Sequence, residues 1–158
     1  MLGWRKRERT LWFKALLIAI LEQLPSEYAS LLNQVRDGIV GGVAKPGRMS
    51  VGTHPNYIGF WYDPAVVRRY EDQDRRAAYD EFLDRIEARE TPVEEPPVTM
   101  LILRGISAYS YEKSEYVEID LVVAHGLVAG LDSTVPMGPR TIDNTRVVIG
   151  QLVVQERS

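Results

Sequence analysis

Two carboxylates set two residues apart are the side chains whose types and spacing best suit chemistry. Glu118 and Asp120 stand in a segment where apolar and polar residues alternate, so a β-strand carries both on one face. Paired carboxylates can share acid–base work or hold a hard cation. The same alternation is typical of the solvated face of an antiparallel sheet, and it favours that interpretation over a catalytic pair.

A third interpretation of these carboxylates is an acidic docking face, extended by Glu112 and Glu115, that suits a basic partner. Tyr57 and Trp61 share one face of a short aromatic segment. Strand aromatics are usually core residues, but tyrosine and tryptophan are also enriched at protein interfaces. We therefore expect a protein partner to bind at six candidate residues, which are Tyr57, Trp61, Glu112, Glu115, Glu118 and Asp120.

Other motifs give no catalytic constellation. His54 and His125 are the two histidines, both in predicted turns, and a metal site needs two or three converging ligands. The absence of cysteine excludes disulfides, thiolate zinc sites and cysteine nucleophiles. The glycine-rich stretch 42–47 continues into Arg48 and Met49, where a phosphate-binding loop needs lysine and then serine or threonine. We predict no catalytic residue, no cofactor and no metal.

Composition places these residues in one globular domain. The chain has 158 residues, a net charge of −3, and hydrophobic and charged fractions of 45% and 26%. Its mild acidity argues against nucleic-acid binding. The apolar run Ala15–Leu21 is too short to span a membrane, and no small-residue cleavage site follows it. We expect a cytoplasmic protein comprising a single domain, 1–158.

The amino end is basic, with Trp4 and Trp12 interleaved among arginines and lysines. Such a segment can lie on anionic lipid or nucleic acid. It is more typical of the frayed, solvated start of a helix, since chain termini are commonly poorly ordered.

A helical half is predicted over residues 11–90. Apolar spacing predicts a helix over Leu11–Leu24 that ends at Pro25, and Ser26 is expected to cap a second helix that ends at Gly38. A strand is expected at Tyr57–Tyr62, and Asp63-Pro64 begins a long charged helix that runs to about residue 90. The apolar stripe of the second helix comprises Tyr28, Leu31, Leu32 and Val35.

A proline-rich connector, 91–97, leads into a predicted antiparallel β-meander over residues 98–155. Met100, Ile102, Ile106 and Ala108 are assigned to one side of its first strand. Its clearest part is a hairpin within Tyr116–Leu131. The predicted fold class is therefore α+β, with helices covering one face of an antiparallel sheet of three or four strands.

Two segments resemble bacterial toxin-immunity proteins of the SUKH superfamily. Leu24-Pro25, followed by a helix that contains Tyr28 and ends at Gly38, looks like the early signature of that superfamily. Residues 116–131 are similar to a strand–turn–strand with a central glycine found in such modules. The resemblance covers about a quarter of the chain and implies a non-enzymatic α+β protein that blocks a toxin. The displaced pair Gly41-Gly42 and the long charged helix depart from the pattern.

Three functions remain open from the sequence. The first is a protein-binding module, in its more specific form an immunity-type inhibitor of a basic bacterial toxin domain. The second is a structural or accessory subunit that self-assembles through the last strand or the first helix. The third is a small hydrolase or metal-dependent enzyme that uses Glu118, Asp120 and a histidine.

Overall fold

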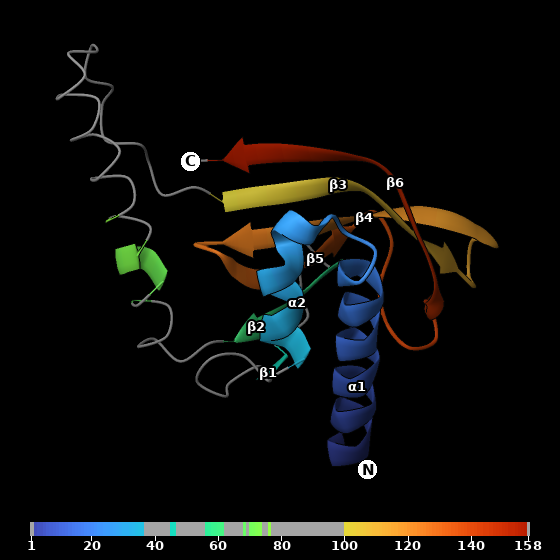
Figure 1. The fold of residues 1–158 in the computed structure, drawn as a ribbon. Coiled ribbons are helices and arrows are strands. Elements are labelled where there is room, and N and C mark those ends of the chain that lie inside the picture. The colour runs from blue at the N-terminus through green and yellow to red at the C-terminus, as the bar shows by residue number, and fades with distance from the viewer. Residues whose placement is uncertain are drawn as a thin grey trace, which may run out of the picture.

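The computed structural model describes residues 2–36, 45–46, 56–61, 68, 70–73, 76 and 100–157. An α-helix, α1 (Leu2–Leu21), is followed by a short 3₁₀ turn, η1 (Ser26–Tyr28), and by helix α2 (Ala29–Arg36). The strands are β1 (Lys45–Pro46), β2 (Tyr57–Trp61), β3 (Met100–Ser110), β4 (Glu115–Ala124), β5 (Leu127–Ser133) and β6 (Ile142–Arg157). The α+β class is confirmed (Figure 1).

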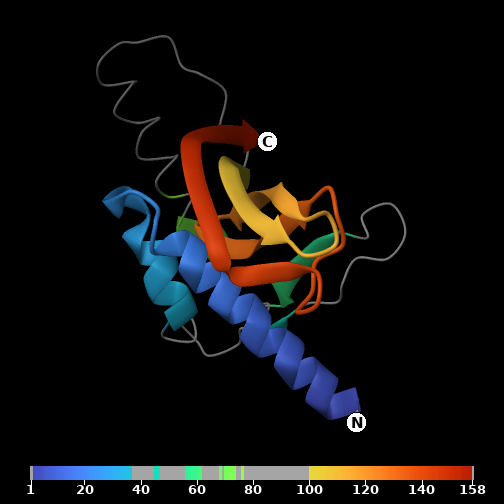
Figure 2. The same cartoon turned by 90° about the vertical axis from the view of Figure 1, so that its right-hand side faces the viewer.

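The six strands form an antiparallel sheet in the order β1-β2-β5-β4-β3-β6. Strands β3, β4 and β5 follow one another as predicted, and residues 125–126 turn β4 into β5. The predicted meander is wrong for β6, which crosses back to pair with β3 in the manner of a Greek key. Figure 2 shows β6 bending along the side of the sheet and passing close to α1.

Helix α1 begins nine residues before the predicted start, at Leu2. Its core-facing side chains include Phe13, Leu16, Leu17 and Ile20, which are fully buried. The prediction of a frayed, solvated start is wrong at Trp12, which is 7% exposed. Its indole Nε1 donates a 3.0 Å hydrogen bond to the carbonyl of Ile142 in β6. A contact across 130 residues thus fixes this turn of the helix.

The segment after α1 differs from the predicted cap. Ser26 lies within η1, and the residue that precedes η1 is Pro25, which makes no side-chain capping hydrogen bond. In α2, Leu31 and Val35 are buried, as is the polar Gln34. The amide of Gln34 donates to the carbonyl of Gly126 (2.6 Å) and accepts from the N–H of Val128 (3.2 Å). It therefore attaches α2 to the β4–β5 hairpin.

A β-bulge in β3 corrects the predicted facing of that strand. The register of β3 against β4 shifts between Leu103 and Ile106, and Gly105 lies there at a φ of 96°. Glycine accepts such a φ without the steric cost that other residues meet. As a result Leu103, rather than Ile102, shares the core-facing side with Ile106 and Ala108.

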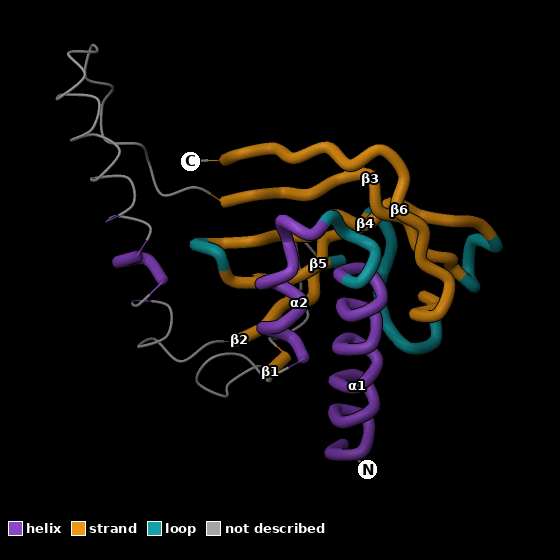
Figure 3. Tube along the Cα trace, viewed as in Figure 1, coloured by secondary structure: helices purple, strands orange, loops and turns teal. Residues whose placement is uncertain are grey.

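One hydrophobic core joins both helices to the inner face of the sheet, which we define as the face that contacts α1 and α2. Both helices lie on the same side of the sheet (Figure 3). From β4 the core receives Val117, Ile119, Leu121 and Val123, as the alternation predicts. The opposite side of the strands is the outer face.

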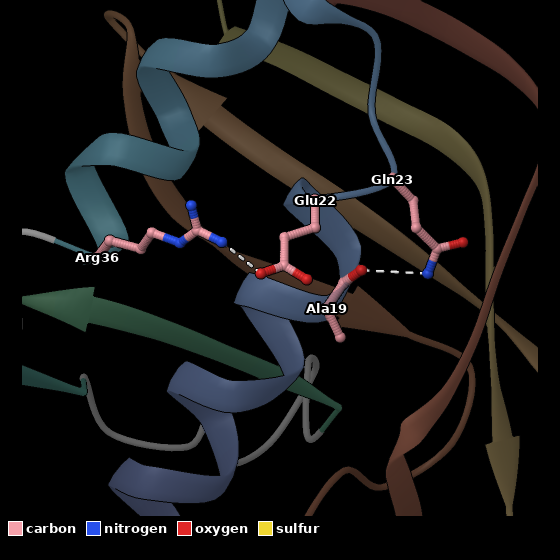
Figure 4. Close-up of polar contacts among 4 residues, drawn as sticks. All are labelled: Ala19, Glu22, Gln23 and Arg36. Atoms are coloured by element: carbon pink, nitrogen blue, oxygen red, sulfur yellow. Dashed lines mark hydrogen bonds and ion pairs between the residues drawn. The ribbon is translucent and has the colours of Figure 1, made fainter.

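Polar contacts fix the end of α1 against its neighbours. Glu22 forms an ion pair with Arg36 at the end of α2, and Gln23 donates to the carbonyl of Ala19 (Figure 4). Gln23 also donates to the carbonyl of Val147 in β6, at 3.1 Å.

Several predicted elements lie outside the described residues. They are the connector 91–97, Gly38, and most of the charged helix predicted to begin at Asp63, of which residues 68, 70–73 and 76 are described as helical. Within the described residues, no helix combines the length and the apolar character that crossing a membrane requires.

Candidate functional site

The outer face of the sheet carries three of the six predicted site residues. Glu118 lies opposite Ser107, between the inward-facing Val117 and Ile119. Asp120 and Tyr57 belong to one row across the strands, because both pair with Asp132 of β5. Since directly opposed residues share a face, the register places these predicted residues on one surface.

Tyr57 is only partly a surface residue. Its hydroxyl lies so close to Gly59 and Gly130 that a Cβ at either position would meet the Oη at 2.7 Å. The two glycines thus leave room for the tyrosine ring along the outer face. Burial, followed by the nearby charge of Asp132, raises the pKa of the Tyr57 phenol. Trp61 is the last residue of β2, and its side chain lies outside the described residues.

The most distinctive feature of the outer face is a group that we call the tyrosine–arginine cluster, comprising Tyr109, Tyr111, Tyr116 and Arg146. The Tyr109 ring makes edge-to-face contacts with Tyr111 (6.1 Å between centroids) and Tyr116 (5.7 Å). Arg146 Cζ lies 3.8 Å from the centroid of Tyr109 and 5.8 Å from that of Tyr116. Tyr111 and Tyr116 remain 51% and 46% exposed.

Asp143 lies beside Arg146, and its charge acts on the guanidinium of that arginine. Its carboxylate accepts from the hydroxyl (2.6 Å) and from the backbone N–H (2.9 Å) of Thr145. These hydrogen bonds, together with one from Tyr111 and the charge of Arg146, lower the pKa of Asp143. A hydrogen bond to Tyr116 and the charge of Asp143 raise the pKa of Arg146. The cluster is therefore ordered by contacts between three strand segments and the β3–β4 turn.

The acidic residues surround the cluster without forming a single face. Glu112 is exposed in the turn, and Glu115 is exposed at the first position of β4. Strand alternation places Glu115 on the side opposite Tyr116, so it does not continue the row of Glu118. Asp120 Oδ2 lies 3.6 Å from Arg104 Nε across the outer face.

The histidines are not brought to these carboxylates in the described part of the chain. His125 lies in the β4–β5 turn with a φ of 53°, and its Nε2 is 3.5 Å from Glu71 Oε1. Its side chain is 16% exposed, so His125 is a largely buried turn residue. His54 lies outside the described residues. Among the described residues, no three acidic or histidine side chains are grouped to hold a metal ion.

Sequence reasoning missed the tyrosine–arginine cluster. A signal was available for its aromatic part, because Tyr109, Tyr111 and Tyr116 fall within eight residues at the two sides of one turn. No local signal indicates Arg146, which reaches the cluster from β6. The register of β6 against β3 shifts between Ala108 and Tyr109, so Tyr109 pairs with Asp143 rather than with Arg146.

No protein-family model, curated protein or solved structure matches this chain. Its function is therefore inferred from the arrangement of the outer face.

Proposed function

We propose that this chain is a non-enzymatic protein-binding module whose contact surface is the tyrosine–arginine cluster with the neighbouring Glu118. The observation that supports it is the exposure of Tyr111 and Tyr116 in a group that ring contacts and Arg146 already hold together. Tyrosine and arginine are the residue types enriched at the energetic centres of protein interfaces. Because the cluster is built mainly on strands, a partner meets side chains that lose little freedom on binding.

The charge around the cluster indicates the chemistry of the partner. Glu112 and Glu118 are exposed near the β3–β4 turn, and Asp143 lies beside the cluster, where Lys113 and Arg146 oppose these three carboxylates. A net acidic rim favours a basic partner and accelerates its association at low ionic strength. A basic toxin domain fits this description, so an immunity-type inhibitor is the more specific form of the proposal.

A carboxylate-dependent hydrolase has less support. Asp120 forms an ion pair with Arg104. Such a contact is typical of a structural carboxylate on a sheet, and His125 contacts Glu71 rather than this pair.

The test compares substituted chains in a binding assay. Chains immobilised as wild type, Arg146→Ala, Tyr116→Ala and Arg9→Ala are exposed to lysate of the source organism, and retained proteins are quantified by mass spectrometry. Arg9 is the matched control because it is exposed on α1 and belongs to none of the strands that carry the cluster. A candidate partner is then purified, and its dissociation constant is measured by calorimetry at two salt concentrations.

We expect Arg146→Ala and Tyr116→Ala each to weaken binding by at least about tenfold, while Arg9→Ala leaves it within about threefold. We also expect higher salt to slow association. A partner that binds Arg146→Ala as tightly as wild type would refute this surface. The immunity form also predicts that co-expression of the chain restores growth of cells that carry the partner toxin, and that Arg146→Ala reduces this protection.

A further inference from the structure

Strand β6 is an edge of the sheet over its whole length, since it pairs with β3 and no other described strand joins its far side (Figure 3). Its two halves differ in the contacts that they make with the rest of the described structure. In the first half, the carbonyl of Ile142 accepts from Trp12, and that of Val147 accepts from Gln23. Helix α1 and the turn after it thus cover this part of the edge.

The second half of β6 carries exposed apolar side chains instead. Val153 is 52% exposed and Val154 is 42% exposed, and both follow Leu152, which packs against the core. An uncovered strand edge presents backbone groups that can pair with another chain, and proteins usually protect such edges with charge, proline, short length or a β-bulge. Residues 151–155 contain no charged residue and no proline. The register of β6 against β3 shifts between Ile149 and Val153, at the start of this segment, and from Val153 to Arg157 the pairing runs without a shift.

The sequence of this segment is self-complementary. It reads Gln151-Leu152-Val153-Val154-Gln155, so that reversal about Val153 matches glutamine with glutamine and an apolar residue with an apolar residue. In antiparallel pairing of two identical strands, a two-fold axis perpendicular to the sheet pairs a residue with itself at the centre, so this sequence places side chains of like character opposite each other. We propose that two copies of this chain associate through this segment, with the axis at Val153.

The facing of the side chains agrees with this register. Val153 lies opposite Arg104 and therefore on the outer face, so the two copies of Val153 meet there. Val154 lies opposite Leu103, on the inner side, where it meets Leu152 of the second copy. Glu156 falls opposite Gly150 of the second copy, so the pairing brings no like charges together.

This association is separate from the proposed partner surface. It uses the free edge of β6, whereas the tyrosine–arginine cluster lies on the outer face near the β3–β4 turn. Either proposal can therefore fail without the other.

The experiment measures molar mass by light scattering across about 10 to 300 μM, a range chosen to include micromolar dissociation constants. Four preparations are compared: wild type, Val153→Lys, Val153→Glu, and Val148→Lys. Val148 is the matched control, because it is 49% exposed, lies on the same strand and face opposite Ser107, and falls outside the self-complementary segment. Circular dichroism establishes that each variant folds. This check is needed because a new charge at residue 153 lies beside Arg104.

For wild type and Val148→Lys, we expect the mass to rise from 17.9 kDa toward twice that value as concentration increases. Val153→Lys and Val153→Glu alone place like charges on the axis and weaken self-association at least about tenfold. An equimolar mixture of the two places opposite charges there and recovers the doubled mass. A wild type that stays at 17.9 kDa over the whole range, equal loss in Val148→Lys, or no recovery in the mixture overturns the proposal.

Discussion

Replacement of Trp12 by phenylalanine tests whether tertiary contacts, rather than helix propensity, fix the first helix. Trp12 is 7% exposed, and its indole donates to the carbonyl of Ile142, a residue that is 1% exposed. Trp12→Phe removes that donor and part of the ring while it keeps an aromatic side chain in the core.

The expected cost follows from two contributions. A buried carbonyl that loses its partner costs about 1–3 kcal/mol. The smaller ring also leaves apolar volume unfilled. The cost of this loss stays below the about 3–5 kcal/mol that full truncation to alanine costs. We therefore expect Trp12→Phe to lower the free energy of unfolding by about 2–3 kcal/mol. For a chain of this length, that corresponds to a fall in Tm of roughly 5–10 °C.

The measurement is urea unfolding followed by far-ultraviolet circular dichroism, which does not depend on the altered chromophore. Leu11→Ala is the neighbouring control, because Leu11 is 61% exposed and its removal should change the free energy of unfolding by less than about 0.5 kcal/mol. The reasoning would be refuted if Trp12→Phe and Leu11→Ala had the same unfolding midpoint with unchanged denaturant slopes.

Two further predictions concern the sheet. Gly105→Ala should lower the free energy of unfolding by more than about 2 kcal/mol, because a residue with a Cβ is strained at a φ of 96° and the added carbon would lie 2.2 Å from the carbonyl oxygen of Gln151. Gly138→Ala, whose nearest contact would be 4.0 Å away, should leave the free energy of unfolding nearly unchanged in the same urea titration. A similarly small change for Gly105→Ala would count against the bulge. Hydrogen bonds hold the folded-state pKa of Asp143 below its ordinary 3.8, so its contribution to stability is present above about pH 4 and is lost as pH falls through the lower folded value. Asp143→Asn should therefore unfold at a lower temperature than wild type near pH 7, with the difference shrinking toward about pH 3, and a difference that is independent of pH would contradict this origin.

Local patterns in the sequence were sufficient to predict the hairpin and the facing of β4. Alternation at Val117, Ile119, Leu121 and Val123 identified the inner face because a strand exposes successive side chains on opposite sides. The same rule failed in β3, where the bulge at Gly105 shifts the alternation and turns Leu103, not Ile102, toward the core. A bulge depends on how two strands pair, so a single strand read alone does not reveal it.

For the candidate site, too, the sequence predicted strand faces but not which strands lie side by side. Tyr57, Glu118 and Asp120 could be assigned to strand faces from their spacing, but their position on one surface depends on pairing among β2, β5 and β4. Glu115 was grouped with them by proximity in sequence, and strand alternation separates it from that face.

By itself, the sequence determined the fold class, the absence of cysteine chemistry, and the acidic and aromatic character of the segments around the β3–β4 turn. Only the tertiary structure decided that β6 returns to β3, which brings Arg146 onto Tyr109 and the carbonyl of Ile142 to Trp12. The physical reason is the sequence distance over which each property is determined. Side-chain periodicity is set by neighbouring residues, whereas strand order and register are set by the burial of a shared core that residues more than a hundred positions apart complete together.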